Sequence, residues 1–417
     1  MEAKVKGAWI IHHTNKLNSV AISSPEYEQL TFAGKCGMLL NGVAASEQTT
    51  LSKSRVNVLA SAAGISTRLE LPVIIEELKR QRLIDESSNE ITVLGLSTGD
   101  TLSHAARIYE EAKPTATEQA SIEIAESVSE CPLSGKIVSE QISDSFKIKS
   151  SDTKDIIRQF NDIGFVDSES IGNDKIFFNG NLFRKDNIRK INGVLSSLSS
   201  AEEGKIRNLL AILDNKGCIS LEEALVVTSQ EIIDKIISIA FIDINTIGNE
   251  IGTYMYVTRP SAFKKFSNPV VDDAFDLAKA FLTSLTFGMT KSSYYRGRIK
   301  MIEALMNKLI QGYWVGPATA IGQDYKILEF KGVIQVRPEE NGMFSMKLLK
   351  RDIGELAYKV ISEGEASTSS MAQFPSVSAT KYIGPEPNRT VKRKKQSVPL
   401  KKGIATLLND LRTGGIK

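Results

Sequence analysis

Apolar and polar positions follow one pattern four times along the chain. In each copy an amphipathic helix is followed by two apolar residues that begin a strand, then a polar turn and a second strand. The aligned turns are Leu83-Ile84-Asp85, Phe165-Val166-Asp167, Phe241-Ile242-Asp243 and Val333-Ile334-Gln335. Their last positions differ by 82, 76 and 92 residues. Each copy therefore has about the length of one small domain.

The second copy shows why this pattern should fold in that way. Its helix carries Ile156, Ile157, Phe160 and Ile163 at the spacing of one helical face. Gly164 then predicts the end of the helix, because glycine tolerates a left-handed backbone. A polar turn separates the two apolar runs that follow. We therefore expect a helix followed by a two-stranded hairpin.

The residues before each copy predict two further helices. The expected first helices cover residues 32–44, 117–129, 200–214 and 292–310. A second helix and its turn are expected at residues 59–66, and second helices at 133–143 and 220–225. In the fourth copy Gly316-Pro317 interrupts the second helix. Gly64 fits a sharp turn between helices, and Pro72 fits the first turn of the next helix. Ser220 fits a helix cap.

This succession of helices and a hairpin resembles the winged-helix superfamily, without indicating a particular family. The resemblance implies a mainly α (α+β) fold of tandem winged-helix modules with small β-hairpin wings. The runs GAWIIHH and SVAISS predict a further hairpin before the first module. The predicted divisions are an N-terminal β-hairpin extension at 1–30, winged-helix modules at 31–115, 116–190 and 199–260, a bridging helix with a winged-helix-like fourth module at 270–362, and a disordered basic tail at 363–417.

The charge pattern separates the tail from the rest of the chain. The whole chain has a net charge of +3, whereas residues 376–417 contain ten basic and two acidic residues, which leaves −5 for the remainder. The tail is rich in Ser, Thr and Pro before it becomes basic, which is typical of disorder. Its short amphipathic end predicts docking in the groove of a protein partner, through Ile404, Leu407, Leu408 and Leu411.

The sequence contains no recognisable catalytic, metal or cofactor site. Cys36, Cys131 and Cys218 are odd in number and far apart, which argues against a disulfide framework and the common zinc spacings. His12 and His13 are neighbours in an expected strand, so they should point to opposite faces. The triplets SGK and AGK lack the upstream glycine of a phosphate-binding loop. We therefore expect a protein that is not an enzyme and has no cofactor.

The same features predict a soluble, cytoplasmic protein without a membrane partner. The N-terminus does not have the pattern of a secretion signal. Apolar stretches stay shorter than the roughly 18 residues that span a bilayer. Free thiols suit a reducing compartment.

Basic and aromatic residues are the strongest indication of function, because they can neutralise phosphates and stack on bases. Lys154 and Arg158 are four residues apart, so they share a helix face. The run KSSYYRGRIK combines cations with two tyrosines. The candidate nucleic-acid-binding residues are Arg68, Lys79, Arg80, Lys147, Lys149, Lys154, Arg158, Tyr294, Tyr295, Arg296, Arg298, Lys300, Lys392, Arg393, Lys394 and Lys395.

Two functions are compatible with these features. The first hypothesis is a regulatory or architectural nucleic-acid-binding protein, with DNA favoured over RNA. The alternative is a scaffold subunit whose modules bind proteins, which the acidic third module and the small net charge favour. Each basic cluster also has a simpler interpretation, as a solvated helix face. A continuous basic surface would favour nucleic acid, and apolar patches with acidic rims would favour the scaffold.

Overall fold

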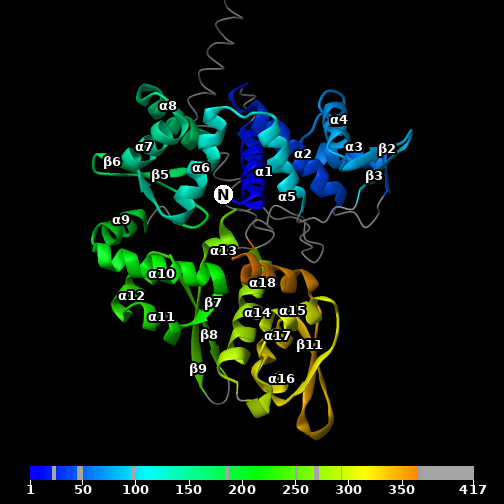
Figure 1. Ribbon diagram of the computed structural model, residues 1–417, viewed down its shortest axis with the longest axis vertical. Helices are drawn as coiled ribbons and strands as arrows, with labels where there is room; N and C mark the ends of the chain where they lie inside the picture. Colours follow the sequence, from blue (N-terminus) through cyan, green and yellow to red (C-terminus); the bar gives the residue numbers. More distant parts are fainter. Residues whose placement is uncertain are drawn as a thin grey trace, which may run out of the picture. The chain divides into compact units, whose positions relative to one another are not determined.

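The computed structural model describes residues 1–20, 25–44, 50–94, 100–183, 187–248, 252–266, 272–292, 294–364 and 366. The chain is mainly helical and carries small three-stranded antiparallel sheets. It divides into two compact units, of which the first is Met1–Gly180 and the second begins at Asn181 (Figure 1).

Each unit contains two copies of one order of elements: helix, strand, helix, helix, strand, strand. Module 1 consists of α2 (Glu28–Ala44), β1 (Thr50–Ser52), α3 (Lys53–Ala62), α4 (Leu71–Arg80), β2 (Ile84–Glu86) and β3 (Glu90–Val93). Module 2 consists of α6 (Ala116–Glu130), β4 (Leu133–Ser134), α7 (Gly135–Phe146), α8 (Ser150–Ile163), β5 (Asp167–Ile171) and β6 (Asp174–Phe178).

The second unit repeats this order in modules 3 and 4. Module 3 consists of α10 (Ser200–Lys216), β7 (Cys218–Ser220), α11 (Leu221–Val227), α12 (Gln230–Ser238), β8 (Asp243–Gly248) and β9 (Thr253–Thr258). Module 4 consists of α15 (Ile302–Ile310), β10 (Val315–Ala318), α16 (Thr319–Asp324), α17 (Lys326–Phe330), β11 (Ile334–Pro338) and β12 (Phe344–Leu348).

All four sheets share one strand order, in which the last strand of the module lies between the other two: β1-β3-β2, β4-β6-β5, β7-β9-β8 and β10-β12-β11. In modules 1 to 3 the first strand ends on a serine that caps the following helix. The hydroxyls of Ser52, Ser134 and Ser220 accept hydrogen bonds from the amides of the third helical residues, at 3.3, 3.4 and 3.1 Å. One serine thus ends a strand and satisfies a free amide at the start of a helix.

The first unit is organised around α1 (Ala3–Val20), which packs against α2 and α5 (Asp100–Glu111). Glycines allow this close approach. A Cβ atom at Gly7 would lie 1.9 Å from the carbonyl oxygen of Leu102, and one at Gly34 would lie 1.9 Å from Oγ1 of Thr14. Trp9 is buried in this helix, as are its apolar neighbours. No larger residue than glycine fits at these two crossings without moving the helices.

Hydrogen bonds join modules 1 and 2 within the first unit. Glu118 forms a capping box with Thr115 at the start of α6 and also accepts a hydrogen bond from the amide of Leu30, at 2.9 Å. The hydroxyl of Tyr27 donates to Oε1 of Gln159, at 3.1 Å. Because Glu118 is fully buried, its two sets of bonds fix the start of α2 against the start of α6.

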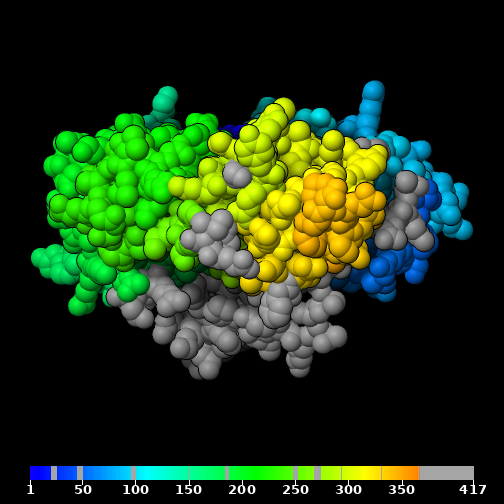
Figure 2. Space-filling model, turned by 90° about the horizontal axis from the view of Figure 1, so that it is seen from below, coloured from blue at the N-terminus to red at the C-terminus, as the bar shows by residue number. Residues whose placement is uncertain are grey.

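The second unit is organised around α14 (Asp272–Thr290), which contacts β7, β8 and α18 (Arg351–Glu363). The smaller helices α9 (Ile188–Ser196) and α13 (Ser261–Lys264) complete this unit. One apolar core runs through modules 3 and 4, and the green and yellow surfaces of this unit meet along a broad front in Figure 2. The buried ammonium of Lys279 pairs with Asp243 at 2.5 Å and lies 5.2 Å from the ring of Phe263.

The structure corrects three expectations. Residues 3–20 form helix α1, so the predicted N-terminal hairpin at 1–30 is wrong, and His12 and His13 lie on a helix. The predicted helix at 292–310 begins only at residue 302, after a loop. The second helix of module 2 was expected from residue 133, and that of module 4 was expected to be interrupted at Gly316-Pro317. In both modules a short strand instead precedes the second helix.

Other local expectations are confirmed. Gly164 ends α8 with a φ of 90°, and Gly64 has a φ of 72° in the turn before α4. Pro72 lies in the first turn of α4. Asp85, Asp167 and Asp243 lie in three separate sheets. Among the described residues, helices that combine the length and the apolar character needed to cross a membrane are absent.

Candidate nucleic-acid interface

The loop between α14 and α15 carries five of the predicted residues, and it is anchored to module 4. The guanidinium of Arg296 donates to Oε1 of Gln323 and to Oδ1 of Asp324, each at 2.8 Å. The side chain of Asp324 is fully buried. Arg298 donates from Nε to the carbonyl oxygen of Met289, at 2.8 Å. Arg296 therefore serves to hold the loop, and Arg298 is partly committed to the same task.

The anchored loop exposes two tyrosines beside cations. Tyr294 is 68% exposed and Tyr295 is 96% exposed. Their rings lie at 87° to each other with centroids 6.1 Å apart. The ammonium of Lys300 lies 5.1 Å from the centre of the Tyr294 ring, and Arg298 is exposed nearby in the sequence. The structure thus brings an aromatic surface and positive charge together on one loop.

A second aromatic and cationic pair in module 4 escaped the sequence analysis. The guanidinium carbon of Arg337 lies 4.2 Å from the centre of the Trp314 ring. The neighbouring residue Tyr313 is 60% exposed. The run GYW after α15 was the available signal. These residues follow the end of α15, whereas the tyrosine loop precedes its start. A helix of nine residues spans about 13 Å, so the two pairs are separate features.

Module 2 exposes its predicted cations around the start of α8. Lys147, Lys149 and Lys154 are exposed and form no ion pair with a described residue. Arg158 pairs with Asp155 one turn away, at 3.2 Å. Residues 116–180 contain twelve acidic and six basic residues. The lysines therefore form a small cationic site on a module with an acidic total.

Module 1 neutralises two of its three predicted cations. Lys79 pairs with Glu86 at 3.1 Å, and Arg80 pairs with Glu77 and Glu111, each at 2.7 Å. Hydrogen bonds from Arg80 and Gln81 hold the pKa of both Glu77 and Glu111 below its usual value. These carboxylates stay charged and would compete with a phosphate. Of these three predicted cations, only Arg68 is exposed without an ion pair to a described residue.

Module 1 also exposes apolar side chains around its helix pair. Leu69, in the turn before α4, is 79% exposed, and Val58 and Val73 are each more than half exposed. They lie on or next to α3 and α4. This surface differs in kind from the cationic site of module 2, because it offers apolar area in place of charge.

The remaining predicted residues lie in the tail, and module 3 carries none of them. Helix α12 has an acidic and apolar composition, as expected, and no residue in it was proposed to bind nucleic acid. Arg189 and Lys190 on α9 are exposed cations that the sequence analysis did not select, although the run IRK marked them. The tail residues Lys392, Arg393, Lys394, Lys395, Ile404, Leu407, Leu408 and Leu411 lie outside the described residues.

The histidines and cysteines take structural positions. His13 is fully buried, its Nε2 lies 3.1 Å from the carbonyl oxygen of Ser121, and its ring stacks on Phe165 at 3.9 Å. Burial lowers the pKa of His13 to about 3. Burial likewise raises the pKa of the Cys36 and Cys218 thiols. Within the described part of the chain, acidic, histidine and cysteine side chains do not gather in threes as a metal site requires.

Comparison with known proteins adds no relative. Neither a protein-family model nor a curated protein matches the chain.

Proposed function

We propose that the chain is a non-enzymatic nucleic-acid-binding protein built from four tandem winged-helix modules, with DNA as the favoured partner. Three helices, a strand before the second helix and a hairpin after the third are the order of a winged helix, and all four modules have it. The shared strand order supports this assignment. Regulatory or architectural roles in transcription, replication, genome or plasmid maintenance, or defence suit such an array, since fold alone does not fix function.

The observation that carries the proposal is the anchored loop of module 4. Two exposed tyrosines offer ring faces on which unpaired bases can stack, and each stacked base contributes about 1–3 kcal/mol. Lys300 and Arg298 supply positive charge for the adjacent phosphates. Because Arg296 holds the loop from inside, little backbone freedom is lost when a nucleic acid binds.

Module 2 and the tail supply the electrostatic part of the proposed binding. Lys147, Lys149 and Lys154 are free to contact phosphates, whereas Lys79 and Arg80 must first leave their carboxylates. The cations at 392–395 attract the backbone phosphates of a nucleic acid, whatever its nucleotide sequence. Several weak sites on one chain then add through effective concentration.

The first experiment measures binding of labelled single-stranded and duplex DNA to the full chain by fluorescence anisotropy. The double variant Tyr294→Ala, Tyr295→Ala should bind single strands about 10- to 100-fold more weakly, which corresponds to the loss of one or two stacked bases. Tyr313→Ala is the matched control, because Tyr313 is also exposed but lies at the other end of α15. Equal affinity of parent and double variant would contradict the proposal.

The second experiment measures the salt dependence of duplex binding. Replacing Lys149 and Lys154 with Ala should lower the slope of log K against log salt by up to about 0.9 per lost phosphate contact. Replacing the four cations at 392–395 should weaken binding to all duplexes alike. Lys79→Ala is the control, because Lys79 already pairs with Glu86. If every variant has the parental slope, the cations of module 2 and the tail do not contact phosphates.

A scaffold function has its own supporting observation, the exposed apolar side chains of module 1. Leu69, Val58 and Val73 resemble the apolar centre of a protein interface more than a phosphate site. A photo-crosslinking residue at position 69 tests this directly in cells. Specific capture of one protein, combined with parental DNA binding by the double tyrosine variant, would replace the nucleic-acid proposal by the scaffold.

A further inference from the structure

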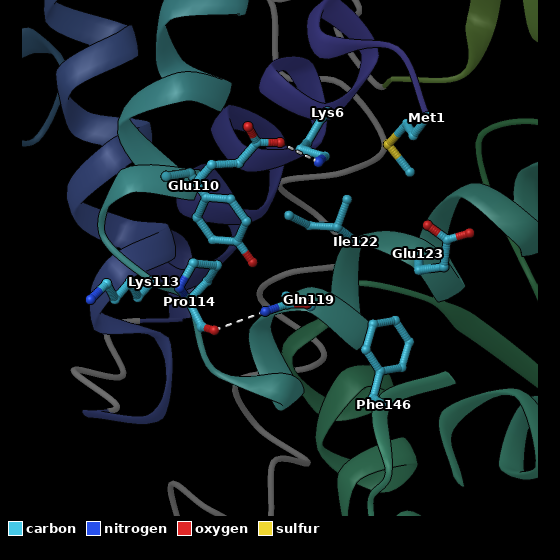
Figure 3. Close-up of a pocket in the computed structure, with 10 residues that line it drawn as sticks. Met1, Lys6, Glu110, Lys113, Pro114, Gln119, Ile122, Glu123 and Phe146 are labelled. Carbon is cyan, nitrogen blue, oxygen red and sulfur yellow. Dashed lines mark hydrogen bonds and ion pairs between the residues drawn. The ribbon is translucent and has the colours of Figure 1, made fainter. Parts of the chain in front are cut away.

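A cavity of about 470 Å³ lies in the first unit, between helices α1 and α5 on one side and module 2 on the other (Figure 3). Side chains of α1, α5, α6 and α7 line it, so module 2 and the two helices packed against it contribute to its wall. Its size lies within the usual range for small-molecule sites. Figure 3 shows Lys6, Ile122 and Phe146 around the space, drawn from three of these helices.

The lining is apolar at its most buried points. Ile122 and Tyr109 are both nearly inaccessible to solvent, and Pro114 and Phe146 add further apolar surface. Two of these four residues carry aromatic rings. An aromatic ligand would gain both burial and favourable ring contacts at such a surface.

Tyr109 carries the one polar group among these apolar residues. Its side chain is only 2% exposed, and its hydroxyl finds no hydrogen-bond partner among the described residues. Burial raises the pKa of Tyr109, and the carboxylates of Glu118 and Glu110 add to the effect. The hydroxyl therefore keeps its proton and can donate a hydrogen bond to an acceptor. A buried donor without an acceptor is costly and uncommon in native proteins.

Charged groups of both signs surround the cavity. Lys6 pairs with Glu110 at 2.6 Å, and Lys113 and Glu123 add one charge of each sign. The amide of Gln119 donates to the carbonyl oxygen of Pro114 at 2.9 Å, as the dashed line in Figure 3 shows. A ligand of either charge would therefore meet repulsion as well as attraction. A neutral ligand pays neither cost.

We propose that this cavity binds a small neutral aromatic molecule with one hydrogen-bond acceptor, which accepts a hydrogen bond from the Tyr109 hydroxyl. Because α1, α5 and module 2 line the cavity, the bound molecule stabilises the packing of these two helices against module 2. The site is separate from the proposed nucleic-acid interface and does not depend on it.

Two bicyclic probes of similar size test the acceptor. Quinoline is neutral at pH 8 and has one acceptor nitrogen, whereas indole has an N–H donor in its place. Titration calorimetry on the full chain should show quinoline binding and a rise in the melting temperature of the first unit. Tyr109→Phe should weaken quinoline binding about five- to tenfold, the usual value of one neutral hydrogen bond, and leave indole unchanged. Tyr27→Phe, a variant outside the cavity, should not alter quinoline binding.

The free protein provides an independent measurement. Tyr27 is a second buried tyrosine of the same unit, but its hydroxyl has a partner in Gln159. Tyr27→Phe should therefore lower the melting temperature, whereas Tyr109→Phe should leave it unchanged or raise it. Equal destabilisation by both variants would show that the Tyr109 hydroxyl is already satisfied, and would overturn the proposal. Failure of quinoline to bind at millimolar concentration, or equal binding to parent and Tyr109→Phe, would overturn it as well.

Discussion

Each unit is organised around one deeply buried helix, but α1 and α14 are buried by different kinds of contact. In α1 the buried residues include hydrogen-bonding side chains: the indole of Trp9 donates to Glu126 at 2.6 Å, and His13 lies against the carbonyl oxygen of Ser121. In α14 the buried hydroxyls of Thr283, Ser284 and Thr286 donate to carbonyl oxygens of the same helix, while Phe281 and Leu285 belong to the apolar core of the second unit.

This difference predicts which kind of change should destabilise each unit. Directional bonds tie α1 to one position against module 2, because a shifted helix would leave buried polar groups without partners. Lys279 of α14 also pairs with Asp243, but the apolar packing around this helix has no such direction and responds to every change of volume. The first unit should therefore be sensitive to protonation and the second to truncation.

The largest expected effect follows truncation of α14. Phe281→Ala removes a fully buried ring and should cost about 3–5 kcal/mol. Calorimetry should show a lower melting temperature for the second unit only. Asp276→Ala on the same helix is the control, because its side chain is 63% exposed and its ion pair with Lys264 should contribute little. A simultaneous fall in both transitions would show that the two units do not unfold independently.

The same two helices show where sequence reasoning works and where it fails. The segment of α14 was predicted as a helix because polar residues alternate with apolar ones at helical spacing. The segment of α1 was predicted as two strands, because GAWIIHH is a short apolar run with β-forming residues. A short apolar run fits a strand or a buried helix equally well. Burial of both faces removes the amphipathic signal that would decide between them.

The candidate interface likewise has features that the sequence could predict and features that it could not. Composition sufficed to locate Tyr294, Tyr295 and Lys300, because exposed aromatic and basic residues are recognisable in a run. Composition could not show that Arg296 binds the buried Asp324, or that Arg80 binds Glu111. Those partners are 28 and 31 residues away, and only the fold brings them together. Long-range ion pairs decide which cations remain available.

The second prediction concerns pH. All three histidines of the chain lie in the first unit, and His13 has a pKa of about 3 against 6.5 when unfolded. Between pH 7 and pH 5 the unfolded chain gains a proton at His13 that the folded chain does not. Stability should therefore fall as pH falls, by about 2 kcal/mol at pH 5. The second unit, without histidine, should change less.

Denaturant titrations at pH 7 and pH 5 measure this difference. His13→Gln removes the titrating group, so its first unit should lose less stability between the two pH values than the parent does. His104→Gln is the control, because His104 is only partly buried and its pKa is lowered to a smaller extent. A parental pH dependence in His13→Gln would show that another group causes it.

The smallest expected effect follows removal of a helix cap, and it can be compared between the two units. Thr115 caps α6 and Ser199 caps α10, each with a glutamate three residues later. Replacement of a cap by Ala costs about 0.5–2 kcal/mol. Thr115→Ala should lie at the upper end, because its partner Glu118 is buried and also holds the amide of Leu30.

Ser199→Ala should lie at the lower end of that range for a different reason. Its partner Glu202 also pairs with Lys235, at 2.9 Å, so an ion pair on the same carboxylate survives the loss of the cap. Water can reach this end of the helix and satisfy the freed amide, whereas it cannot reach Glu118. Denaturant midpoints of the two variants measure the difference. A larger loss for Ser199→Ala would mean that the bond between Glu118 and Leu30 does not join modules 1 and 2 in solution.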